Sequence, residues 1–184
     1  MKTSSGWVQG YNGQVLVNER GIILAQEITA SHADSLRLGP MLDQVERHAA
    51  ALGIADEERR SGVFTADAGY CSEANLDQLE RRGIDAYVAT GRERHYRAGI
   101  ASVRAKPRTP RRAAMRIKLQ TEGGRKIYAR RKAMTEPVHG LTKQTRGFRQ
   151  FLLRGLEKVP GEFTLINLTH NLLKLWRSGL APAA

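Results

Sequence analysis

The sequence predicts an α/β fold in which a mixed sheet is flanked by helices. Two features lead to this prediction: an antiparallel hairpin near the start of the chain and a parallel strand–helix–strand unit near its middle. The chain has 184 residues, of which 41% are hydrophobic, enough for one domain with an ordinary core. We therefore expect residues 1–184 to form a single domain.

The hairpin is predicted from two aliphatic runs, GQVLVN at 13–18 and IILAQEIT at 22–29. Between them, Gly21 can take a positive φ and close the turn. A helix is expected over 34–52, because apolar residues recur there three and four positions apart before Gly53. Its apolar face consists of Leu38, Met41, Val45, Ala49 and Leu52.

The strand–helix–strand unit covers 62–90. The run GVFTA ends directly before Asp67, Ser72 can cap the following helix, and Gly83 follows the cationic end of that helix. The run IDAYVAT at 84–90 is then the second strand. A crossover through one helix makes the two strands parallel.

The C-terminal half is expected to hold a basic excursion followed by helices. Residues 91–126 are interrupted by glycine and proline, which predicts an excursion outside the core. Helices are expected over about 127–177, the first broken or restarted at Pro137 and the last, 162–177, packed through an apolar stripe. The stripe consists of Leu165, Leu168, Leu172, Leu175 and Trp176. The opposite face is expected to meet solvent or DNA, and it consists of Asn167, His170, Asn171 and Lys174.

The charge distribution favours a polyanionic partner, most often a nucleic acid. Thirty Lys and Arg residues outnumber eighteen Asp and Glu residues, for a net charge of +12. Residues 91–133 alone hold fifteen basic residues and two acids, and Arg111 and Arg112 among them are candidate DNA contacts. The alternative is a solvated basic loop.

Cysteine usage and hydropathy indicate a reducing, non-membrane location. The single cysteine, Cys71, excludes an internal disulfide framework and is expected to be a small buried residue. No apolar run is long enough for a membrane span, and the start MKTSSGWVQG lacks a signal-peptide core. We expect a cytoplasmic, nucleoid-associated protein.

Two carboxylates, Asp67 and Glu136, are candidate metal ligands. Asp67 follows a strand, and Glu136 shares a helical face with His139 and Lys143. Converging carboxylates can hold Mg²⁺ for phosphodiester chemistry while a lysine binds a nearby phosphate. From spacing alone, however, Asp67 is more often a cap or turn residue. Glu136, before Pro137, is likewise more often a first-turn acid.

Three blocks of the sequence resemble bacterial insertion-sequence transposases of the DDE class. They are GWVQGYNGQVLV, TADAGYCSEANLDQLERRGIDAYVATGRERH and GRKIYARRKAMTEPVHGLTKQTRGFRQFLLRGLEKVPGEFTLINLTHNLLKLWR. The last block resembles the family's Y-x2-R-x3-E-x6-K pattern. The resemblance implies an RNase H-like fold, DNA as the partner, and Mg²⁺ or Mn²⁺ as the cofactor. It also implies DNA cleavage and strand transfer as the activity.

Carried over by position, Asp67 matches the family's second catalytic aspartate and Glu136 its catalytic glutamate, both metal ligands. Tyr128 and Arg131 match the tyrosine and arginine of the pattern, and the lysine stands at the expected distance after the glutamate. Four residues, where the pattern has three, separate Arg131 from Glu136, so Lys132 can instead take the arginine's role. The candidate DNA-binding residues are Tyr128, Arg131, Lys132, Lys143, Arg111 and Arg112.

The family's first catalytic aspartate has no counterpart here, because no aspartate precedes Asp34. We therefore expect an incomplete RNase H-like sheet, lacking its first strand, in a truncated and inactive transposase. The hairpin should either pair with the strand before Asp67 or stand apart from it. Two alternatives stay open. One is a non-catalytic fragment that binds DNA or associates with itself or with intact transposase, and the other is a different RNase H-like nuclease.

Overall fold

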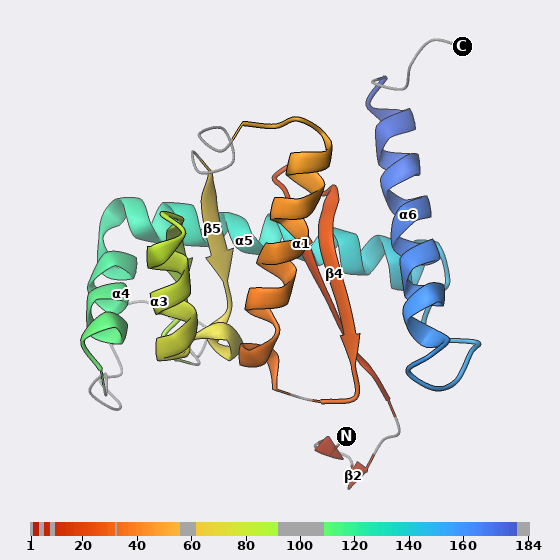
Figure 1. The fold of residues 1–184 in the computed structure, drawn as a ribbon, viewed down its shortest axis with the longest axis horizontal. Helices are drawn as coiled ribbons and strands as arrows, with labels where there is room; N and C mark the ends of the chain where they lie inside the picture. The colour runs from red at the N-terminus through yellow and green to blue at the C-terminus, as the bar shows by residue number, and fades with distance from the viewer. Residues whose placement is uncertain are drawn as a thin grey trace. The chain divides into compact units, whose positions relative to one another are not determined.

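The computed structural model describes residues 2–3, 6–7, 10–31, 33–55, 62–91 and 109–179. The chain divides into two compact units. The first comprises 1–32, 40–48 and 132–184, and the second comprises 33–39 and 49–131. Strands and helices occur in both units, which confirms the α/β class (Figure 1).

The hairpin of the first unit forms as predicted. Strands β3 (Asn12–Val17) and β4 (Ile23–Thr29) pair antiparallel. The Asn18 side chain accepts hydrogen bonds from the N–H groups of Arg20 and Ile22, and Gly21 takes a φ of 72°. The turn is therefore closed by an Asx-type contact and by the one residue type that adopts this φ without strain.

The outer edge of β4 is covered by side chains in place of a further strand. The Ile23 N–H donates to Asn171 Oδ1, and Asn171 Nδ2 donates to the Ile23 carbonyl, both at 2.8 Å. The ring of His48 donates from Nδ1 to the Leu24 carbonyl at 2.9 Å. The Gln26 N–H donates to Gln44 Oε1. An edge satisfied in this way has fewer free groups with which to pair another strand.

Helix α6 (Val159–Arg177) supplies Asn171, and it packs on β4 through the face opposite the predicted one. His170 is fully buried and donates from Nε2 to the Gly21 carbonyl at 2.9 Å, and Asn167 donates to Gln26 Oε1. The predicted packing stripe is exposed instead, at 63, 50, 55, 41 and 74% for Leu165, Leu168, Leu172, Leu175 and Trp176. The prediction was wrong because hydrogen-bonding side chains, not leucines, satisfy the strand edge.

Helix α1 (Leu38–Ala51) follows a short 3₁₀ turn, η1 (Asp34–Leu36). Leu38, Met41 and Ala49 are buried as predicted, and Gly53 ends the helix with a φ of 69°. Leu52 is 76% exposed, because it lies beyond the last helical residue and leaves the apolar face.

The strand–helix–strand unit lies in the second unit and matches the prediction. Strands β5 (Val63–Ala66) and β6 (Asp85–Val88) are parallel. Between them come a 3₁₀ turn, η2 (Ala68–Tyr70), and helix α3 (Glu73–Arg81). Ser72 caps α3 by accepting from the Asn75 N–H at 3.1 Å.

The predicted mixed sheet does not form among the described residues. They make three two-stranded sheets: β3 with β4, β5 with β6, and β1 (Lys2–Thr3) with β2 (Gly6–Trp7). Within the described ranges, no strand ladder joins the hairpin to the strand before Asp67. The coverage of the β4 edge by α6 and α1 side chains accounts for its lack of a further strand partner.

The basic stretch 91–126, predicted to be an excursion, contains one helix among its described residues. Residues 92–108 lie outside the described residues, but α4 (Pro110–Gln120) is a helix that packs against α3 and β6 (Figure 1). Pro110 at the start of α4 lacks an N–H that the first turn would leave unpaired, which favours helix initiation there.

Helix α5 (Glu122–Gly140) continues through Pro137 and ends in a π-helical turn, η3 (Leu141–Thr145). The predicted break at Pro137 is therefore absent. Among the described residues, no helix combines the length and apolar character that crossing a bilayer requires.

Candidate functional site

Asp67 occupies the turn directly after β5, where its carboxylate has two partners. Its Oδ1 accepts a hydrogen bond from the Gly69 N–H at 3.3 Å, so Asp67 caps η2. Its Oδ2 lies 3.8 Å from the guanidinium of Arg131. About half of the side chain, 53%, stays exposed. The residue is thus both a cap and an accessible carboxylate, and the two interpretations of the sequence are compatible.

Arg131, on α5, contacts both Asp67 and the ring of Tyr128. Its guanidinium carbon lies 5.5 Å from the centroid of the Tyr128 ring, a cation–π distance. Its side chain is 22% exposed, and its Nε is buried without a hydrogen-bond partner in the described part of the chain. The structure therefore brings together three residues that the sequence proposed for one site: Asp67, Arg131 and Tyr128.

Asp34 also approaches this turn and was not singled out from the sequence. A Cβ placed on Gly69 would lie 2.7 Å from Asp34 Oδ2, so the carboxylate fits against a glycine that has no side chain to obstruct it. The sequence signal for this contact was the absence of a side chain at Gly69, two residues after Asp67.

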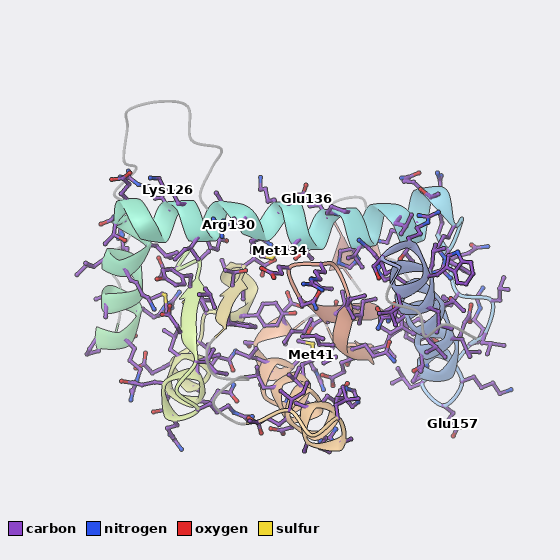
Figure 2. The ribbon with its side chains drawn as sticks, turned by 90° about the horizontal axis from the view of Figure 1, so that it is seen from above. Met41, Lys126, Arg130, Met134, Glu136 and Glu157 are labelled. Atoms are coloured by element: carbon purple, nitrogen blue, oxygen red, sulfur yellow. The ribbon has the colours of Figure 1, made fainter. Side chains whose placement is uncertain are left out.

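Glu136 belongs to the first unit, in the second half of α5, and projects into solvent (Figure 2). Lys132, one turn earlier, and Lys143, in η3, are also exposed. The pKa of His139 is lowered by desolvation of its ring and by the Lys143 ammonium. The His139 ring is therefore neutral near pH 7, and it lies on the same helical segment as Glu136.

Arg111 and Arg112 hold α4 in place. The guanidinium of Arg111 bonds three carboxylates of α3, those of Asp77 and Glu80 at 2.9 Å and of Glu73 at 3.2 Å. Arg112 donates to the Thr90 carbonyl at 3.3 Å. Their positive charge is thus directed at protein groups in this structure.

Cys71 is buried, as predicted, at the start of the segment that leads into α3. Burial raises the pKa of its thiol, while nearby Arg112 acts in the opposite direction. A thiol with a raised pKa is mostly protonated near neutral pH, which makes it a poor nucleophile.

Asp67 and Glu136 have side chains of the right chemistry for Mg²⁺. Among the described residues, however, they are not part of a complete set of metal ligands. Carboxylate oxygens are ligands that Mg²⁺ prefers. No group of three or more His, Cys, Asp or Glu side chains within the described ranges is arranged to hold a metal ion.

Comparison with known proteins identifies one family. The family model described as "Transposase DDE domain" matches residues 1–172, nearly the whole chain. No curated protein and no solved structure matches.

Proposed function

This chain belongs to the transposase DDE domain family, and from that membership we propose that Asp67 and Glu136 carry its DNA chemistry, with Mg²⁺ or Mn²⁺ as the cofactor. The family transposes DNA by cleavage and strand transfer. An RNase H-like arrangement of the strands is part of the same proposal. It agrees with a carboxylate placed directly after a parallel strand.

The observation that carries the proposal is the pairing of Asp67 with Arg131. A half-exposed carboxylate beside a guanidinium can offer oxygen to a cation while the guanidinium binds a phosphate. Tyr128, next to Arg131, adds a π-face on which a base or sugar can pack. DNA and the Asp67 carboxylate would then meet at one turn of the second unit.

The catalytic part of the proposal is tested with Asp67→Asn and Glu136→Gln. Asparagine keeps an oxygen that can accept from the Gly69 N–H, so the η2 cap and the fold should survive. The assay is nicking and joining of supercoiled plasmid DNA with Mg²⁺ or Mn²⁺. Glu157→Gln is the matched control, because Glu157 is exposed like Glu136 but lies before α6 (Figure 2).

Metal-dependent nicking or joining that both variants abolish and the control retains would support the proposal. Activity that survives in either variant would overturn the assignment of that carboxylate. Circular dichroism of each variant checks that the fold is unchanged.

The DNA-binding part is tested by the salt dependence of affinity. Removing a lysine that binds one phosphate should reduce the slope of log K against log salt by about 1. We expect this for Lys132→Ala and Lys143→Ala, whose side chains are exposed. Lys126→Ala is the control, because Lys126 is paired with Glu122 in the second unit. Equal slopes in all three variants would contradict the assignment.

A second candidate function, non-catalytic DNA binding, is favoured by the satisfied state of Asp67. Both carboxylate oxygens already face protein groups, Gly69 and Arg131, so a structural role explains the residue without a metal. In that case Asp67→Asn and Glu136→Gln would leave the affinity for DNA unchanged. No nicking of DNA would appear with Mg²⁺ or with Mn²⁺. Association with DNA in the nucleoid follows from either function.

A further inference from the structure

Helix α6 presents an exposed apolar face that the proposed DNA chemistry does not use. Four leucines and a tryptophan are each 41–74% exposed along one side of the helix, and together they are called the α6 stripe: Leu165, Leu168, Leu172, Leu175 and Trp176. Soluble proteins seldom expose an apolar area larger than a few hundred Å² without a partner for it. The opposite face cannot turn outward in exchange, because it is hydrogen-bonded to β4.

The loop before α6 extends this apolar surface at the start of the helix. Leu152, Leu153 and Leu156 are 82, 44 and 50% exposed. The N–H groups of Leu152 and Leu153 each donate to the Glu162 carboxylate at 2.8 Å, so the loop is fixed against the first turn of α6. These hydrogen bonds therefore give the apolar surface of the loop a defined shape.

The spacing of the stripe is self-complementary. Leucines at 165, 168, 172 and 175 are symmetric about the level of His170. Two copies of α6 related by a twofold axis at that level, running antiparallel, would place Leu165 of one opposite Leu175 of the other, and Leu168 opposite Leu172. A closed dimer requires such an isologous arrangement, in which the same patch meets itself.

Charge complementarity supports the antiparallel direction. Glu162 lies in the first turn of α6, and Lys174 and Arg177 lie in the last. Antiparallel pairing brings the acid of one copy beside Arg177 of the other, whereas parallel pairing sets like charges side by side. It also brings exposed Trp176 to the leucine loop that Glu162 fixes in the other copy.

The available area agrees with a dimer at the lower end of the specific range. A fully exposed large apolar side chain corresponds to roughly 100 Å² of surface. Eight such side chains per copy, about half exposed, together with their polar neighbours amount to on the order of 1,000 Å² over two copies, near the minimum for a specific interface.

We propose that the α6 stripe is a homodimer interface, in which two copies of this chain pair antiparallel through α6. The proposal does not depend on the DNA chemistry of Asp67 and Glu136. Because each copy carries a net charge of +12, self-association should strengthen as salt screens the repulsion between copies. DNA binding should weaken under the same change, so the two behaviours are separable.

Sedimentation equilibrium of the full chain at several concentrations and salt levels is the primary test. Leu168→Glu and Leu172→Glu should weaken self-association on the order of 30-fold or more, as expected at the centre of an interface. Both positions are half exposed, so the fold should tolerate the change. Ile117→Glu is the matched control, an exposed apolar residue on α4, and it should dimerise like the unmodified chain.

Disulfide trapping tests the antiparallel register. In a Cys71→Ser background, Leu165→Cys and Leu175→Cys chains carrying different tags are oxidised separately and as a mixture. The mixture should give crosslinked heterodimers, and each chain alone should give few homodimers. A monomer at every concentration, a dimer that survives both glutamate variants, or a crosslink that forms equally in the separate samples would overturn the proposal.

Two other occupants of the stripe would be recognised by the same variants. Co-sedimentation of a monomeric chain with anionic phospholipid vesicles, abolished by Leu168→Glu, would replace the dimer by a membrane surface. A monomer whose unfolding free energy drops in both glutamate variants would show that another part of the chain covers the stripe. Either result would refute the homodimer.

Discussion

Replacing Asn171 by alanine should destabilise the first unit, because one side chain satisfies both backbone groups of Ile23. The amide accepts from the Ile23 N–H and donates to its carbonyl, each at 2.8 Å. Ile23 is 8% exposed, so alanine would leave two largely buried polar groups without partners. Each such group costs about 1–3 kcal/mol. Water that enters beside the shorter side chain reduces the sum to roughly 2–4 kcal/mol.

The assay is urea unfolding followed by far-ultraviolet circular dichroism, together with hydrogen exchange of the Ile23 amide. With a slope near 2 kcal/mol/M, the destabilisation should move the unfolding midpoint down by about 1–2 M. The Ile23 amide should also exchange faster, because the substitution removes its acceptor. Gln150→Ala is the control: it removes an exposed amide that has no hydrogen bond in the described part of the chain.

A destabilisation below about 0.5 kcal/mol, in the range of ordinary surface substitutions, would refute the reasoning. An unchanged Ile23 exchange rate would do the same. Either result would mean that α6 does not serve as the hydrogen-bonding partner of the β4 edge.

Three substitutions and one chemical reaction probe the rest of the fold. Gly21→Ala should cost about 1–2 kcal/mol in urea unfolding, because alanine resists a φ of 72° and its Cβ would lie 3.1 Å from Lys174 Nζ. Leu79→Ala should cost about 2–5 kcal/mol at a side chain that is 2% exposed, whereas Leu52→Ala, 76% exposed, should change stability by less than about 0.5 kcal/mol. Cys71 should react slowly with a thiol reagent at pH 8 and rapidly in denaturant; fast reaction of the folded chain would contradict its burial and its raised pKa.

The local elements could be predicted from the sequence because their signals are short-range. The turn at Gly21, the cap at Ser72 and the helix end at Gly83 depend on residues within a few positions of each other, and all three form as predicted. The parallel pairing of β5 with β6 follows from the chirality and length of one crossover. The family could likewise be recognised from blocks of residues in order, and the match over 1–172 confirms it.

The candidate site could be predicted only in part. Asp67, Tyr128 and Arg131 were named from the sequence and are neighbours in the second unit, although 60 or more positions separate Asp67 from the other two. The glycine at position 69 was not enough to predict the approach of Asp34, because that approach depends on where η1 is placed in space. The pairing of Arg111 with three acids of α3 likewise depends on the packing of α4.

The sequence by itself determined the hairpin, the parallel strand–helix–strand unit and the family to which the chain belongs, since these depend on local or ordered patterns. It also determined that α6 is amphipathic. Only the tertiary structure decided which face of α6 turns inward. Periodicity measures apolar content, but the edge of β4 presents N–H and C=O groups that leucine cannot satisfy. Asn171 and His170 therefore pack inward, and the leucines remain exposed on the outer side.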